Sequence, residues 1–136
     1  MNAFFGQTLN HKETLVIVGG QVDCISAIQM LRQGLSRYPS RIPVVVSAMC
    51  GESSTADFIK THYEWVNKFS KVILALDNDQ AGQEAVEKAK EILNPDTTLV
   101  ATYSLKDANE YLVPRNNKTA NDFASDVVWN ATPVKS

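Results

Sequence analysis

The segment that most constrains the fold is Lys71–Gly82, in which a continuous apolar run ends at two aspartates and a glycine. The residues between Lys71 and Asp77 carry no charge and are aliphatic or β-branched, which is typical of a strand covered on both faces in a parallel sheet. After Gly82, apolar residues recur at helical spacing and charged residues occupy the other face. The segment therefore predicts a strand, an acidic turn and a helix.

Asp77 and Asp79 lie at the carboxyl end of this predicted strand, where open α/β sheets bind their ligands. Two carboxylates about 4 Å apart repel by roughly 4 kcal/mol at the effective dielectric of a protein surface. A hard divalent cation such as Mg²⁺, or Mn²⁺ in its place, relieves that repulsion. Asp79 has a second interpretation, as the N-cap of the helix that begins near Gln80, and the sequence leaves both open.

Three more apolar runs, each followed by a turn, repeat this pattern along the chain. They are Thr14–Val18 before Gly19 and Gly20, Val44–Ser47 before a small-residue turn with Gly51 and Ser53, and Thr97–Tyr103 before Lys106 and Asp107. One helical pattern starts at Val22, and another, after the second run, ends near Lys68. A further helical pattern extends from Lys118 to Trp129. Strands alternating with helices predict an α/β fold with a mainly parallel, four-stranded sheet flanked by helices.

Carboxyl ends of parallel strands meet at one edge of a sheet, so this fold brings several polar positions together. The acidic candidates are Asp23, Asp77, Asp79 and Asp107. Together they indicate Mg²⁺-dependent chemistry at a phosphate. Gly20, Gly51 and Ser53 are candidate nucleotide- or phosphate-binding positions, because such turns let a backbone approach an anion closely.

Composition bounds the remaining possibilities. A chain of 136 residues with 44% hydrophobic and 21% charged residues fits one globular domain. We divide it into a lead-in segment (1–13), the α/β domain (14–113), and a C-terminal helix with the start of a linker (114–136). The net charge of −2 requires that any nucleic-acid contact be local, metal-bridged or supplied by another domain. Two cysteines and no long apolar run favour a cytoplasmic protein without a membrane span.

Basic residues cluster in a polar stretch broken by Gly34, Pro39 and Pro43. They are Arg32, Arg37 and Arg41. These side chains can contact a phosphate backbone, or they can simply belong to a solvated loop, which is the simpler interpretation.

In these motifs the chain resembles the TOPRIM domain of topoisomerases and primases, and within it the primase-helicases of short-tailed phages and the Twinkle-like helicases. Leu15–Asp23 resembles the family's first strand and EGxxD motif, and Asp77–Gly82 is similar to its DxDxAG motif. Lys106–Glu110 resembles a further motif of the phage branch, and Val128–Ala131 is similar to the segment before the linker to the helicase ring. The resemblance covers nearly the whole chain.

The resemblance implies a function in RNA primer synthesis during phage DNA replication, in the cytoplasm of the host cell. Asp77 and Asp79 would bind the catalytic Mg²⁺ (or Mn²⁺) ions, with Asp107 and Asp23 completing the cluster. Lys106 would either meet a nucleoside triphosphate or balance the neighbouring carboxylates. The implied partners are nucleoside triphosphates and a single-stranded DNA template, reached through neighbouring domains such as a zinc-binding or helicase domain of the same parent protein.

One departure from the family pattern concerns catalysis. The glutamate expected at the end of the first strand, as a metal ligand or general base, is Gly19 here. Glycine offers no side-chain oxygen, so we expect impaired chemistry on a preserved fold, unless Asp23 takes over the role. The sequence also contains no cysteine-rich zinc module and no Walker A loop, and in this it resembles an excised or stand-alone TOPRIM domain.

Three other functions compete with a primase domain. The first is a catalytically inactive module that binds a metal or a replication partner, which Gly19 and the near-neutral charge favour. The second is the TOPRIM part of a nuclease or topoisomerase, which would need a nucleophilic tyrosine or nuclease domain elsewhere. The third is a phospho-acceptor receiver domain, which normally needs an acidic pair where this chain has Gly19 and Gly20.

Overall fold

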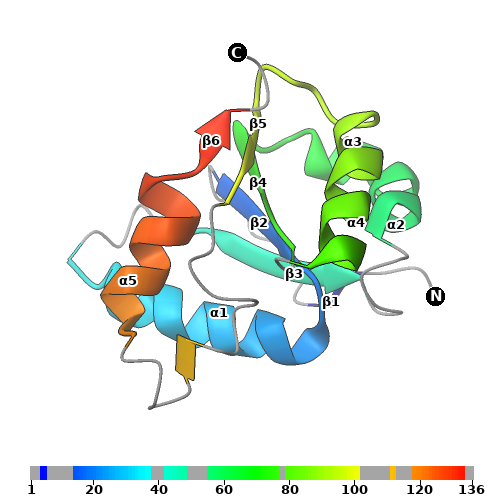
Figure 1. The fold of residues 1–136 in the computed structure, drawn as a ribbon. Helices are drawn as coiled ribbons and strands as arrows, with labels where there is room; N and C mark the ends of the chain where they lie inside the picture. The colour runs from blue at the N-terminus through cyan, green and yellow to red at the C-terminus, as the bar shows by residue number, and fades with distance from the viewer. Residues whose placement is uncertain are drawn as a thin grey trace.

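The computed structural model describes residues 4–5, 14–37, 42–48, 55–76, 79–101, 111–112 and 118–133; at 4–5, 21–23 and 48 only the backbone is described. The elements, in chain order, are β1 (Phe4–Phe5), β2 (Thr14–Val18), α1 (Gln21–Gly34), β3 (Val44–Ala48), α2 (Thr55–Thr61), α3 (Tyr63–Val66), β4 (Lys71–Ala75), α4 (Gln80–Lys90), β5 (Thr98–Val100), α5 (Ala120–Ala124), the π-helix η5 (Ser125–Trp129) and β6 (Thr132–Pro133). Figure 1 shows a central sheet with α1 and α5 on one side and α2, α3 and α4 on the other.

The sheet has the order β1-β3-β2-β4-β5-β6. Its centre is parallel, since β2 pairs in parallel with both β3 and β4, and β4 pairs in parallel with β5. These are the four strands that the apolar runs predicted, so the expected fold class is confirmed. Four of the five residues of β2 and of β4 are buried, as in strands covered on both faces, whereas β5 is buried only at Thr98.

Two short antiparallel strands at the edges extend the sheet beyond the four predicted strands. β1 pairs with β3 through Phe4 and Phe5, in the segment that we interpreted as a lead-in. β6 pairs with β5 through Thr132 and Pro133, in the segment that we interpreted as the start of a linker. Strands of two residues show no periodicity, and a proline is tolerated only at such an edge because it has no N–H to donate.

The alternation of side chains along each central strand divides the core in two. On β2, Leu15 and Ile17 face α2 and α4, whereas Val16 and Val18 face α1 and α5, and all four are fully buried. Cys24 belongs to the second core, where its buried thiol donates a hydrogen bond of 3.5 Å to the Val45 carbonyl oxygen. Within the described residues, no helix has the length and apolar character that crossing a membrane requires.

The helices differ from the predicted ranges in three places. α1 extends to Gly34, so Arg32 lies in its last turn and not in a loop. The helix predicted to end near Lys68 is interrupted at His62, so that α2 and α3 are separate. The C-terminal helix, predicted for 118–129, begins at Ala120 with Thr119 as its N-cap and changes to π-helical hydrogen bonding at Ser125. The π-turn is visible in the bond from the Asn130 N–H to the Ser125 carbonyl oxygen, at 2.8 Å.

The closest approach of α1 and α5 depends on Gly34. A Cβ atom at this position would lie 2.5 Å from the Ala120 carbonyl oxygen and 3.0 Å from the Ala124 Cβ. Real Cβ atoms do not approach backbone atoms so closely, so only glycine allows the end of α1 to pack on α5 in this way. At Gly34 the two helices therefore meet without a side chain from α1 between them.

Candidate functional site: a crevice between β2 and β4

The sheet topology creates a crevice where β2 and β4 end side by side. Val18 pairs with Ala75, so both strands end at the same level of the sheet. From β2 the chain turns into α1, on one face, and continues to β3. From β4 it turns into α4, on the opposite face, and continues to β5. Open α/β sheets bind ligands beyond the carboxyl ends of the strands at such a switch point, and we call this region of the chain the crevice.

Asp79 lies at this crevice and caps α4. Its backbone is extended, with φ −137° and ψ −179°, and its Oδ1 accepts a hydrogen bond of 2.8 Å from the Gly82 N–H. The capping interpretation of Asp79 is thereby confirmed. Capping occupies Oδ1 of this half-buried carboxylate, so Oδ2 is the oxygen that would meet a cation. The donor type and the position both fit a hard divalent ion.

Gly19 and Gly20 form the other wall of the crevice. Gly19 is buried, and Gly20 is the N-cap of α1 with an extended backbone at φ −144° and ψ 169°. No side chain caps α1 at this position. The Gly20 carbonyl oxygen accepts the first helical hydrogen bond from the Cys24 N–H, at 2.9 Å. The opening turn of a 14-residue helix therefore starts at the crevice, with N–H groups suited to an anion.

The other predicted site residues stand outside what the structure describes. Asp77, Gly51, Ser53, Lys106 and Asp107 lie outside the described residues, and Asp23 is placed only by its backbone, in the first turn of α1. Within the described ranges, no group of three or more potential metal ligands is found. The acidic cluster as a whole stays a prediction, in which Asp79 is the member whose side chain is described.

Replacing Asp79 separates capping from metal binding. Asp79→Ala should lower the free energy of unfolding by about 1 kcal/mol, because the Gly82 N–H loses its acceptor. Asp79→Asn should cost much less, since asparagine caps helices as well as aspartate does. Urea unfolding without divalent metal ions measures both, and equal losses in the two variants would argue against the capping role.

The sequence patterns did not indicate a second polar hollow, which lies between the end of α1 and the helices α5 and η5. We call it the α1–α5 pocket, and its volume is about 570 Å³. It is lined by Gln33, Gly34, Ser36, Arg37, Thr119, Ala120, Asn121, Ala124, Ser125 and Trp129. Its two walls are about 80 positions apart in the chain, so no local spacing reveals it.

Comparisons with known proteins agree on the family. A family profile described as Toprim-like matches residues 16–112. The DNA helicase/primase of Enterobacteria phage T3 is 31% identical over 119 residues, an alignment that covers 88% of this chain and 19% of the T3 protein. The chain thus spans about a fifth of the length of that relative.

Two solved structures resemble the fold. One is the structure of the bacteriophage T7 lagging-strand DNA polymerase interacting with primase domains of two gp4 subunits bound to an RNA/DNA hybrid and dTTP. The match has a TM-score of 0.73 and 29% identity, over 91% of this chain and 57% of that chain. The other, the primase fragment of the bacteriophage T7 primase-helicase protein, has a TM-score of 0.66 and 29% identity, over 79% of this chain and 42% of that one. This chain therefore belongs to the Toprim-like family, and within it resembles the primase domains of phage primase-helicases.

Proposed function

We propose that this domain binds Mg²⁺ or Mn²⁺ and serves nucleotidyl transfer in RNA primer synthesis, within a phage replication protein. The single observation that carries the proposal is the crevice between β2 and β4, with the Asp79 carboxylate on one wall and the start of α1 on the other. A carboxylate suits the metal, and helix N–H groups suit the phosphates that the metal would hold.

The role that we propose for each residue follows from its charge. Asp79 and Asp77, with Asp107 and Asp23, would hold the metal ions, and the backbone around Gly20, Gly51 and Ser53 would face nucleotide phosphates. Lys106 would meet the triphosphate. Bound Mg²⁺ supplies charge stabilisation at phosphorus. Template strand and nucleoside triphosphates would reach the crevice with the help of neighbouring domains of the parent protein.

We also propose that Gly19 impairs catalysis. It stands at the end of β2, where the family pattern has a glutamate, and it offers no side-chain oxygen to the crevice. This observation favours a second candidate function, a TOPRIM module that binds metal or a replication partner without turnover. Both functions include the metal site, and they differ in whether a chemical step comes after metal binding.

A metal titration followed by backbone amide NMR tests the site. Adding Mg²⁺ to the full chain should move the amide signals of Asp79 to Gly82 and of Gly20, with saturation at millimolar metal, and paramagnetic Mn²⁺ should broaden the same signals. Asp79→Asn should weaken the apparent affinity about tenfold or more, because it removes a ligand charge. The cap survives in that variant, so the loss reports on the metal rather than on folding.

Two outcomes would contradict the metal site. One is the absence of saturable shifts at the crevice. The other is an Asp79→Asn titration indistinguishable from that of the unaltered chain. As a charge control, Asp96→Asn removes a carboxylate from the exposed turn before β5 and should leave the titration unchanged.

A further inference from the structure

The α1–α5 pocket lies far from the crevice. The crevice adjoins the first residue of α1, whereas the pocket is lined by residues at and just beyond its end. A helix of 14 residues is roughly 20 Å long, so the two places are at opposite ends of α1. A ligand in the pocket therefore makes contacts that are separate from any metal site.

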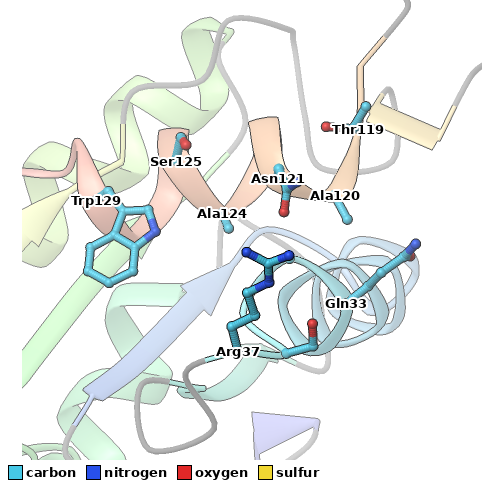
Figure 2. Close-up of a pocket in the computed structure, with 10 residues that line it drawn as sticks. Gln33, Arg37, Thr119, Ala120, Asn121, Ala124, Ser125 and Trp129 are labelled. Atoms are coloured by element: carbon cyan, nitrogen blue, oxygen red, sulfur yellow. The ribbon is translucent and has the colours of Figure 1, made fainter.

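The pocket combines an exposed aromatic ring with a cation and two amides. Trp129, at the end of η5, is 49% exposed. Arg37 follows the end of α1 and is exposed, as are Gln33 and Asn121. Figure 2 shows Arg37 reaching from the end of α1 toward Asn121 and Ala124, with the Trp129 ring on one side and Gln33 on the other. A volume of about 570 Å³ is ordinary for a site that takes a small molecule or a single residue of a polymer.

No carboxylate lines the pocket among the described residues, and the two nearest in sequence each accept hydrogen bonds from a neighbouring residue. Asp122 accepts bonds from the Thr119 N–H at 2.8 Å and from the Thr119 hydroxyl at 3.1 Å. The backbone bond first, and then the hydroxyl bond, lowers the pKa of Asp122, so this cap stays ionised. Asp126 accepts a hydrogen bond from the Tyr111 hydroxyl. Arg37 therefore gives the lining its charge, and the pocket suits an anionic ligand.

The hollow over α2 and α3 makes a useful comparison. It has a similar volume of about 550 Å³ and is lined by Lys60 and Lys68, but Glu64 lines it too. Its lysines are therefore partly balanced within the same lining. The α1–α5 pocket differs in having a cation without a carboxylate, next to a half-exposed indole.

The π-helix explains how the tryptophan reaches the pocket. α5 buries Phe123 and Ala124 against α1, and η5 buries Val127. Widening the last turn from α to π changes the direction of the side chain at its end, and such turns are frequent at functional sites. Ser125 and Trp129, the first and last residues of η5, both line the pocket.

We propose that the α1–α5 pocket binds a nucleotide of a single-stranded nucleic acid, with its base stacked on the Trp129 indole and its phosphate at the Arg37 guanidinium. The Gln33 and Asn121 amides face the base edge and the sugar. That the anionic polymer is a nucleic acid rests on the proposed function. The contacts between the pocket and the nucleotide do not involve the metal proposed at the crevice. Base stacking on an aromatic ring beside a basic group is the general means of holding single strands.

Trp129 itself reports on the pocket. The chain has two tryptophans, so Trp65→Phe leaves Trp129 as the single indole fluorophore. In this background, with EDTA present to remove divalent ions, a short oligothymidylate should quench the fluorescence in a saturable way. Inorganic pyrophosphate, which has charge but no base, should not quench it. Quenching by pyrophosphate to the same extent, or no quenching by the oligonucleotide, would overturn the proposal.

Anisotropy of a labelled oligothymidylate then separates stacking from charge. Trp129→Ala should weaken binding about tenfold or more and leave its salt dependence unchanged. Arg37→Gln should reduce the slope of log K against log salt by about 0.7, the value for one phosphate on a single strand. Lys68→Gln, a matched loss of charge in the comparison hollow, should change neither. An Arg37→Gln effect no larger than that of Lys68→Gln would overturn the proposal.

The metal site at Asp79 and the nucleotide site in the α1–α5 pocket can be rejected independently of each other. Because EDTA is present, a failed metal titration at Asp79 leaves these binding results intact. Conversely, unaltered oligonucleotide binding in both pocket variants would reject the pocket and leave the metal site untouched. Circular dichroism melts of Trp129→Ala and of the milder Trp129→Phe, which keeps an aromatic ring, confirm that the variants compared are folded.

Discussion

Replacing Phe123 by alanine should lower the free energy of unfolding by about 4 kcal/mol. Phe123 is fully buried in the core between the sheet and α1. Its ring also meets the Tyr111 ring edge to face, with the centroids 5.1 Å apart and the planes at 79°. Truncation removes the burial of a large ring, leaves a cavity and deletes an aromatic pair worth about 1 kcal/mol. For a domain with a total stability of about 5–15 kcal/mol this is a severe loss.

Urea unfolding followed by far-ultraviolet circular dichroism measures the effect of Phe123→Ala. The matched control is Leu112→Ala, because Leu112 is 45% exposed and should change the free energy of unfolding by less than about 0.5 kcal/mol. A loss below about 1 kcal/mol for Phe123→Ala would mean that α5 does not pack on α1 as described. If the variant is too unstable to study, Phe123→Leu keeps most of the volume and gives a smaller loss in the same direction.

The layered fold could be predicted because its strands carry a strong local signal. Each central strand is an apolar run that stops at turn residues, and the helical segments between them have their own periodicity. Strand order is different, since it depends on contacts between residues far apart in the sequence. The residues Thr14–Val18 do not indicate that β2 pairs with both β3 and β4. This pairing is nevertheless what creates the crevice.

The candidate site was predictable in part. The sequence allows two interpretations of Asp79, and the structure confirms that it caps α4. Metal binding by the same carboxylate stays a prediction, because capping uses one oxygen and says nothing about the other. Position relative to a strand end was enough to find Asp79, since the first turn of the next helix must start there.

The α1–α5 pocket shows where local reasoning stops. The sequence places Arg37 in a polar stretch that contacts either phosphate or only solvent, and Trp129 at the end of a helix, in a segment that resembles the one before a linker. What joins them is the close approach at Gly34, where a Cβ atom would lie 2.5 Å from the Ala120 carbonyl oxygen. A sequence pattern reports the periodicity within a helix but not which distant helix packs against it.

Restoring the family glutamate with Gly19→Glu should tighten Mg²⁺ binding about tenfold or more. A carboxylate about 4 Å from a cation contributes roughly 4 kcal/mol per pair of unit charges at an effective dielectric of 20, and part of this is lost to desolvation and ordering. The net gain of about 1.4 kcal/mol that corresponds to a factor of ten is a conservative expectation. Gly19→Gln is the control, because it adds a side chain of nearly the same size without the charge.

The sign of the stability change makes this test specific. Gly19 is buried at the end of β2, so both variants carry the same cost of placing a long side chain there. Without metal, Gly19→Glu should be the less stable of the two, because its carboxylate would be desolvated and would join the proposed acidic cluster. Added Mg²⁺ should reverse that order, since a ligand that binds only the folded state stabilises it by RT ln(1 + [L]/Kd). Identical Mg²⁺ dependence of the melting temperature in Gly19→Glu and Gly19→Gln would show that position 19 does not face the metal, and the cause proposed for impaired catalysis would then be wrong.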